Sequence, residues 1–247
     1  MKRIILISFL SMATLWVAMS FSPMPSGPCK LDIVVAHYVG DKPLQLDTAM
    51  YKNELGQPFT VTKFRYYIGN IHLQKKGGGE LIFSDYYLVD EEEPDSKRVM
   101  MTNIPAGEYT GIDFIIGVDS LHNCSGAQSG ALDPVNGMFW AWNTGYIFLK
   151  LEGKSSVSKS PGNIFEYHIG GYRQPNNCIR DVSLKFNQPM LVSVTGDNEL
   201  HLKADAAQVL KGSTLIDFTK LSSVTDFHNA TTIANNYRDM FSILSSK

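Results

Sequence analysis

The stretch from Gly137 to Gly153, GMFWAWNTGYIFLKLEG, constrains the fold more than any other part of the sequence. Its aromatic and β-branched composition predicts one β-strand, in which side chains alternate between two faces. One face is aromatic and carries Trp140, Trp142, Tyr146 and Phe148. The other is apolar and carries Phe139, Ala141, Ile147, Leu149 and Leu151. Two interpretations stay open: the strand is buried on both sides, or one indole lines a site.

The rest of the chain predicts short strands followed by one helix. Strands are expected at about 31–39, 59–74, 81–89, 109–118, 165–171, 178–187, 190–195 and 199–204. Apolar residues recur at helical spacing from Ala230 to Leu244, which predicts one C-terminal amphipathic helix at 230–244. Strands at this short spacing, separated by turn-rich loops, predict an all-β fold, an antiparallel β-sandwich with long loops.

The N-terminus has the features of a secretory signal peptide. Lys2 and Arg3 are followed by an apolar run at 4–17 and by the small-x-small sequence Ala18-Met19-Ser20. We expect residues 1–20 to be removed, residues 21–30 to form a flexible leader, and residues 31–247 to form a single domain. An uncleaved anchor is the open alternative. Export places the protein in the periplasm or outside the cell, with no membrane span in the mature form.

Composition and motifs argue against several classes of function. The formal net charge is -2 at pH 7, so no basic surface indicates nucleic-acid binding. The sequence contains no GxSxG, no P-loop and no GxGxxG after a strand. Nothing therefore indicates an enzyme, although a Ser/His/Asp triad is recognised only by its geometry.

The three cysteines are an odd number for an exported chain. Cys124 and Cys178 lie in turn-rich segments, whereas Cys29 lies in the expected leader. We expect a disulfide between Cys124 and Cys178, since disulfides persist in oxidising compartments. Three free thiols or a thiolate metal site stay open.

The six histidines show no local metal-binding spacing such as HxH or HExxH. His37, His168 and His201 each lie within or at the end of an expected strand, so they are the candidates for a site assembled in three dimensions. Imidazole suits copper and zinc. A different hypothesis is a carbohydrate-binding module, because exposed aromatic side chains on a sandwich face suit stacking on sugars.

Five segments together carry a resemblance to a known family. They are VTKFRYYIGNIHL (61–73), IPAGEYTGIDFIIGVDS (104–120), SGALDPVNGMFWAWNTGYIFLKLEG (129–153), FEYHIGG (165–171) and IANNYRDMF (233–241). In this order they resemble the MbnP-like family of exported copper-binding proteins. The resemblance covers nearly the whole mature chain, and the block around Trp140 and Trp142 is its most specific part.

The resemblance implies an immunoglobulin-like β-sandwich without enzymatic activity of its own. It also implies a copper site built from histidines and a tryptophan oxidised to kynurenine by a separate MauG-like di-haem enzyme, itself related to cytochrome c peroxidases. Trp142, followed by Trp140, is the implied position of modification. The implied copper ligands are His37, His168, His228 and, next, His201.

One departure from the family pattern concerns the copper site. Relatives often carry a histidine-rich ending of the form HVH, whereas this sequence ends in SILSSK. The resemblance therefore implies a depleted, weak or absent site. We expect an exported copper-binding protein that serves copper acquisition or handling. The alternative is a non-enzymatic module that binds a carbohydrate or another surface ligand through the aromatic face.

Overall fold

The computed structural model describes residues 27–140 and 145–246. The predicted signal peptide (1–20) and Trp142 lie outside these residues. The strands are β1 (Pro28–Val39), β2 (Lys42–Pro43), β3 (Tyr51–Lys52), β4 (Pro58–Lys75), β5 (Glu80–Asp90), β6 (Arg98–Pro105), β7 (Gly107–Ile116), β8 (Phe139–Trp140), β9 (Gly145–Lys154), β10 (Ile164–Gly170), β11 (Arg180–Val192), β12 (Glu199–Asp205), β13 (Ser223–Val224) and β14 (Phe241–Ser246). The helices are α1 (Ser120–Cys124), α2 (Ala207–Leu210) and α3 (Ala230–Tyr237), with short 3-10 turns at Pro94–Lys97, Gly130–Leu132, Pro134–Asn136 and Pro161–Asn163.

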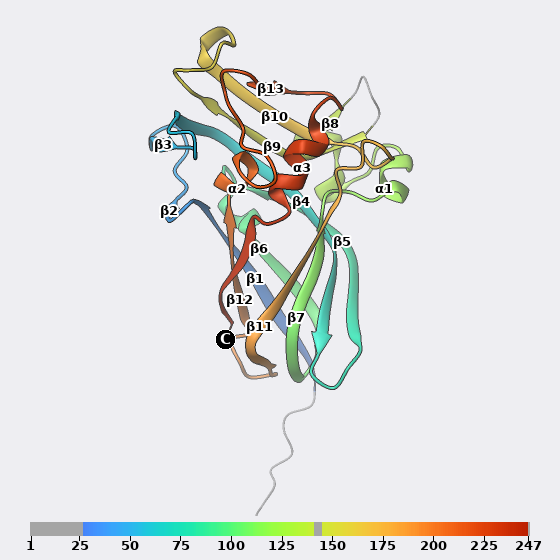
Figure 1. Ribbon diagram of the computed structural model, residues 1–247. Helices are drawn as coiled ribbons and strands as arrows, with labels where there is room; N and C mark the ends of the chain where they lie inside the picture. Colours follow the sequence, from blue (N-terminus) through green and yellow to red (C-terminus); the bar gives the residue numbers. More distant parts are fainter. Residues whose placement is uncertain (1–26, 141–144, 247) are drawn as a thin grey trace, which may run out of the picture.

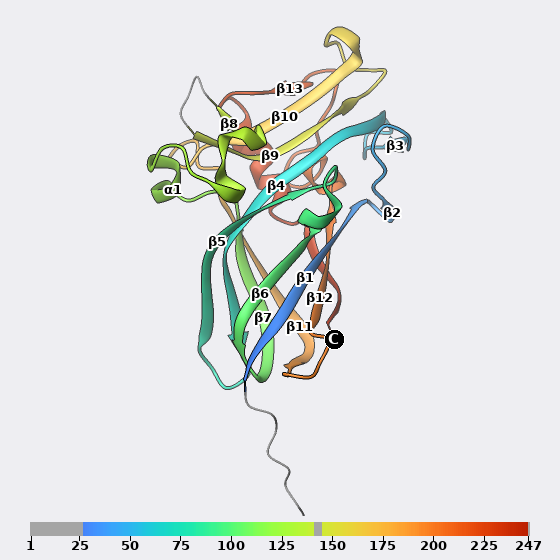
Figure 2. The same cartoon turned by 180° about the vertical axis from the view of Figure 1, so that it is seen from behind.

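The strands form two sheets, which confirms the predicted all-β sandwich (Figure 1). The smaller sheet has the order β14-β12-β1-β2, and β6 pairs with β1 on the edge away from β12, as β2 does. Figure 2 shows this sheet from its own side. The larger sheet has the order β11-β7-β4-β9-β10-β13. The sandwich, predicted as antiparallel, also contains two parallel pairs, β1 with β12 and β10 with β13.

The long strand β4 connects the sandwich to the part of the molecule that holds the site. Its first half pairs with β9, from Thr60 to Tyr66, and its second half pairs with β7, from Ile68 to Lys75. The register shifts after Gly69, whose backbone lies against the Tyr86 ring. The predicted strand 59–74 is therefore one element that pairs with β9 and β7 in turn, and it also pairs with β5 and β3. One half of β4 therefore lies in the sandwich beside β7, and the other half lies beside β9, next to β10 and β8 (Figure 1).

Strict alternation in β1 sets the faces of the smaller sheet. Leu31, Ile33, Val35 and His37 are buried, while the residues between them are less buried. On the neighbouring β12, Leu200 and Leu202 are buried and His201 lies on the opposite face. The side-chain faces predicted for these strands are thus confirmed.

The C-terminal segment differs from the predicted helix at 230–244. Helix α3 ends at Tyr237, and Phe241–Ser246 forms β14, which pairs with β12. Phe241 points into the core, where its ring lies 4.9 Å from Phe114 and 5.6 Å from Tyr66 between ring centroids. Leu244 is exposed instead of lying on an apolar helix face. Pairing with a free sheet edge outweighs the local helical pattern here.

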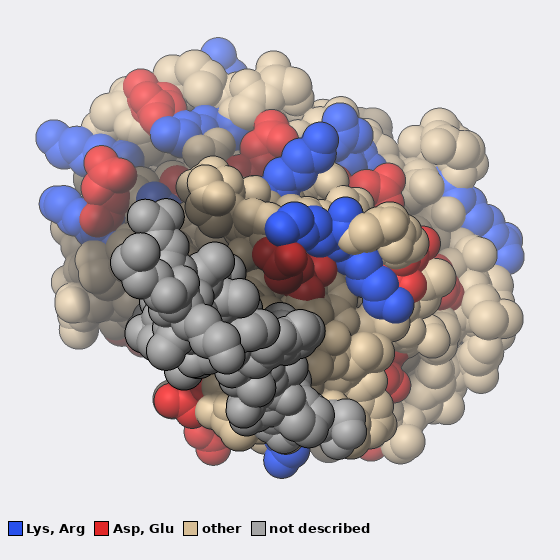
Figure 3. All heavy atoms as spheres, turned by 90° about the horizontal axis from the view of Figure 1, so that it is seen from below, with Lys and Arg blue, Asp and Glu red and all other residues tan. Residues whose placement is uncertain are grey.

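The start of the described chain also differs from the expectation. Strand β1 begins at Pro28, so Pro28–Lys30 belong to the sheet and not to a flexible leader. Cys29 is buried within it. On the face that Figure 3 shows, acidic and basic side chains are interspersed. No helix in the described ranges is long and apolar enough to cross a membrane.

Candidate functional site

The tryptophan block forms a hairpin and not the single strand predicted from its composition. β8 pairs with β9 in antiparallel fashion, with Phe139 opposite Tyr146 and Trp140 opposite Gly145. Opposed residues of an antiparallel pair share a face. Trp140 therefore lies on the opposite face from Tyr146 and Phe148, contrary to the prediction. Both of those residues are buried, as are Ile147 and Leu149, so the strand itself is core on both sides.

Two consecutive glycines let aromatic rings approach the backbone beside the hairpin. A Cβ on Gly170 would lie 2.7 Å from Cζ3 of Trp140, so the indole packs directly on that residue. Gly171 has φ +122° and lies beneath the Phe227 ring. The Trp140 and Phe227 rings meet edge to face, with 5.8 Å between centroids. The FEYHIGG motif thus forms the surface on which the indole rests.

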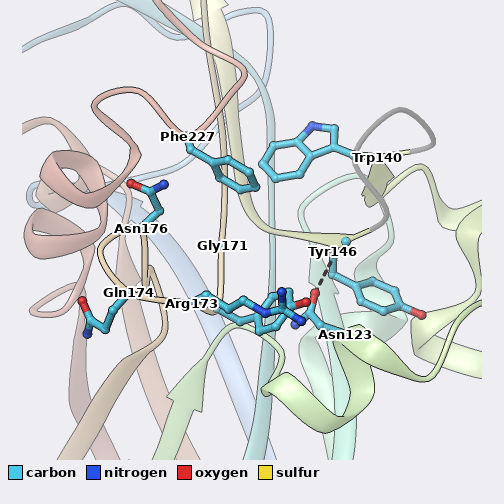
Figure 4. A pocket seen from close by; sticks show the side chains of 10 residues that line it. Asn123, Trp140, Tyr146, Gly171, Arg173, Gln174, Asn176 and Phe227 are labelled. Atoms are coloured by element: carbon cyan, nitrogen blue, oxygen red, sulfur yellow. Dashed lines mark hydrogen bonds between the residues drawn. The ribbon is translucent and has the colours of Figure 1, made fainter.

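A cavity of about 280 Å³ opens beside Trp140 (Figure 4). Trp140 and Phe227 lie on one side of it, and Arg173 lies across from them with Asn123 (Figure 4). Gly145, Tyr146, Gly171, Tyr172, Gln174 and Asn176 complete the lining. Asn123 is structural, because its Oδ1 accepts a hydrogen bond from the Tyr146 backbone and its Nδ2 donates to the carbonyls of Val118 and Asp119.

Arg173 and Tyr172 line this cavity, and both contact the thiol of Cys124. The guanidinium of Arg173 lies over the Tyr172 ring, 4.9 Å from its centroid. Its Nη2 is 3.8 Å from Cys124 Sγ, which in turn is 3.3 Å from the Tyr172 hydroxyl oxygen. The hydrogen bond with Tyr172 lowers the pKa of the Cys124 thiol, and Arg173 acts in the same direction.

The predicted disulfide between Cys124 and Cys178 is not formed. All three cysteines are free, with Cys124 exposed and Cys29 and Cys178 buried. The physical reason is that Cys178 is held inside the molecule: its backbone NH donates to the Gly171 carbonyl and its thiol donates to the Asn176 carbonyl. Burial raises the pKa of Cys178 to about 12.

These environments predict a selective thiol reaction. A disulfide-forming reagent such as dithionitrobenzoate should modify only Cys124 in the folded protein, and all three cysteines after denaturation, because thiolate content and access govern the rate. Peptide mapping after a short exposure checks the assignment, and Cys124→Ser serves as the control. Rapid modification of Cys29 or Cys178 in the native protein would contradict the burial that the structure gives them.

The predicted copper ligand His37 belongs to a buried hydrogen-bond network. Its Nδ1 is 2.8 Å from Oε2 of Glu91, and its Nε2 is 2.8 Å from the Tyr66 hydroxyl. Lys97 also bonds Glu91, at 2.7 Å. Burial lowers the pKa of His37, although the hydrogen bond to Glu91 opposes this effect. Both ring nitrogens are already engaged within the core.

The other three predicted ligands lie elsewhere. His168, on β10, has Nε2 2.8 Å from Glu152, and His201, on the smaller sheet, has Nε2 2.8 Å from Glu199. His228 is exposed in the loop before α3, next to the cavity residue Phe227.

The described residues do not form a site with protein ligands already in place for the copper that the resemblance implies. No three His, Cys, Asp or Glu side chains lie close enough to hold a metal ion within residues 27–140 and 145–246. Residues 1–26, 141–144 and 247 contain none of these four residue types.

Comparison with known proteins places the chain. A family model described as MbnP matches residues 28–229. The chain belongs to the MbnP family. Among solved structures, MbnP from Methylosinus trichosporium is similar to this chain, with 15% identity and a TM-score of 0.47, over 78% of this chain and 80% of that one. No curated protein sequence matches.

This MbnP-family chain has functional candidates that its sequence did not indicate. Arg173 and Phe227 line the cavity and Cys124 contacts Arg173, although the three come from separate segments. The only local signal was the Gly-Gly pair at the end of FEYHIGG, which permits a close backbone approach.

The aromatic face proposed for sugar stacking is not available among the described residues. Trp140 is 6% exposed, and Tyr146 and Phe148 are more deeply buried. A sugar ring stacks on an aromatic face open to solvent. Tyr146 and Phe148 present none, and the small exposed part of Trp140 lines the cavity. The structure therefore gives the carbohydrate-binding alternative no platform within the described ranges.

Proposed function

We propose that this MbnP-family protein is exported and non-enzymatic, and that its Trp140–Trp142 segment is oxidised by a separate MauG-like di-haem enzyme. The observation that carries the proposal is the position of Trp140. β8 holds its indole at the end of a hairpin, beside an open cavity (Figure 4). Trp142, the favoured position, lies two residues after Trp140 in the sequence.

The chemistry supports this role. Indole is electron-rich, so a high-valent haem outside the chain can oxidise it. The di-haem enzyme and its oxidant would cleave the indole C2–C3 bond and add two oxygen atoms, which gives N-formylkynurenine. Water then hydrolyses the formyl amide, which releases formate and leaves an aryl amine and a ketone carbonyl. Indole is a poor metal ligand, whereas these new groups are donors.

Copper handling is the second part of the proposal. The described part of the unmodified chain has no cluster of three conventional ligands, so we propose that the protein holds copper weakly and that tight binding requires the oxidised tryptophan. This differs from a site in which His37, His168, His201 and His228 form a cage.

Co-expression with the di-haem enzyme tests both parts. Mature protein produced alone should keep both tryptophans unmodified, while co-expressed protein should show an oxidised residue by intact mass and peptide mapping. Trp142→Phe and Trp140→Phe assign the position, and each variant is the control for the other. Unchanged tryptophans after co-expression with active enzyme would contradict the modification.

Metal analysis separates the copper part from the modification. We expect about one copper per modified chain after dialysis and a small fraction of that in unmodified protein. Tight copper binding by the unmodified chain would contradict the dependence on oxidation. Oxidised protein that binds no copper would contradict the proposed copper role and would still support the modification.

A further inference from the structure

The cavity beside Trp140 combines apolar walls with the cation of Arg173, which forms no ion pair among the residues that the structure describes. Trp140 and Phe227 form an aromatic corner on one side, and Arg173 lies across the opening (Figure 4). Its volume, about 280 Å³, is close to the lower end of the range of ~300–1,000 Å³ found for small-molecule sites. These features together suit a small ligand with a flat apolar body.

Arg173 differs from the arginines that have structural roles. Arg65 pairs with Asp90 and Glu92, and Arg98 pairs with Asp32 and Glu199. Arg173 forms no ion pair within the described ranges; its guanidinium lies over Tyr172 and approaches Cys124. Stacking on a ring fixes the plane of the guanidinium and leaves its N–H groups for a carboxylate, with which arginine forms paired hydrogen bonds.

Other ligand classes fit the lining less well. A free inorganic anion would gain nothing from Trp140 and Phe227. A sugar would place its hydroxyl groups against these two apolar rings. A neutral aromatic molecule would leave Arg173 unpaired. Asn176, across the Gly171 backbone, adds a polar side chain on the Phe227 side (Figure 4).

We propose that this cavity binds a small aromatic carboxylate, whose ring packs against Trp140 and Phe227 and whose carboxylate bonds Arg173. The site requires neither tryptophan oxidation nor copper. It is therefore independent of the function proposed above, and unmodified recombinant protein suffices to test it.

Naphthoate and its neutral counterpart naphthamide are the probes, measured by calorimetry on the full mature chain. Naphthoate should bind saturably, and naphthamide should bind about tenfold more weakly or worse, because one charge-assisted hydrogen-bond pair is lost. Arg173→Gln should remove this preference for the carboxylate. Arg238→Gln, at an exposed arginine beyond α3, should leave it unchanged.

A second variant tests the apolar wall of the cavity, and a second measurement tests where the carboxylate binds. Phe227→Ala should weaken the binding of both probes, since it removes an apolar wall. Naphthoate should slow alkylation of Cys124 by iodoacetamide in the wild-type protein, because the thiol lies 3.8 Å from the Arg173 guanidinium. Absence of saturable naphthoate binding, equal binding of the two probes, or an unchanged preference in Arg173→Gln would overturn the proposal.

Discussion

Replacing Gly153 with alanine should destabilise the protein by about 3 kcal/mol, at the upper end of what overpacking a core usually costs. Gly153 lies in β9 between β4 and β10, opposite Val61 on one side and Phe165 on the other. A Cβ there would collide with the Thr60 carbonyl oxygen and lie 2.5 Å from Cζ of Phe165. The carbonyl belongs to a paired strand and cannot move away without breaking the sheet.

Thermal unfolding and urea titration measure this effect. For a chain of this size, about 3 kcal/mol corresponds to a decrease in Tm of about 6–12 °C. Gly107→Ala is the matched control, since Gly107 also lies in a strand and a Cβ there meets nothing within 4 Å. Its free energy of unfolding should change by no more than about 0.5 kcal/mol. Equal effects of the two substitutions would contradict the close packing at Gly153.

Stability should fall as the pH drops below about 6.5, and His37 should account for much of this loss. Burial lowers the pKa of His37 in the folded protein, so the unfolded chain takes up a proton at a pH at which the native chain does not. Stability is then complete above the ordinary histidine pKa of about 6.5 and decreases on acidification, by up to about 1.4 kcal/mol per pH unit. Lys97 favours the neutral ring, while Glu91 and Asp90 oppose it.

Glu91 should add to the loss at lower pH. Burial alone would raise its pKa, but hydrogen bonds from His37 and Lys97 outweigh that effect and lower it. The stability that Glu91 contributes is present above its unfolded pKa of about 4.3 and is lost as the pH falls through the lower native value. The two groups therefore act in the same direction over successive pH ranges.

Urea unfolding at a series of pH values tests the role of His37. His37→Gln should be less stable at neutral pH, because Tyr66 and Glu91 lose a partner. Its stability should nevertheless depend less on pH between about 6.5 and 5. His228→Gln, at an exposed histidine, should keep the wild-type slope. A slope that is unchanged in His37→Gln would assign the acid sensitivity to other groups.

Alternation of side chains was a reliable guide wherever one strand runs straight through the sandwich. The faces of His37, His168 and His201 follow from the parity of their neighbours, as β1, β10 and β12 show. The predicted face of Trp140 was wrong because side chains alternate regularly only within one strand. The chain reverses direction between Trp140 and Gly145, and AWNT lacks the Asn-Gly or Asp-Gly pair that marks a tight hairpin.

Long-range pairing explains the remaining differences. The helical pattern of 230–244 is real as far as Tyr237, but Phe241 gains more from the inter-sheet core and from pairing with β12. The prediction of a Cys124–Cys178 disulfide was wrong for a related reason. Both turn-rich segments lie near one cavity, but the Cys124 thiol is exposed and the Cys178 thiol is buried. Local sequence does not report these tertiary partners.

The parallel pairing of β1 with β12 affects how this chain folds as it is made. Residues 28–39 leave the ribosome well before residues 199–205 follow. The same order holds at any translocation pore that the chain enters with its N-terminus first. Until then Leu31, Ile33 and Val35 lie in a strand that lacks its permanent neighbour on one side, and β6 is the first to cover the other. Contacts between residues this far apart in the sequence slow folding. Until β12 is made, the edge of β1 that it will cover stays unpaired and prone to aggregation. Chaperones of the compartment in which the chain folds therefore have a defined period in which to act on it.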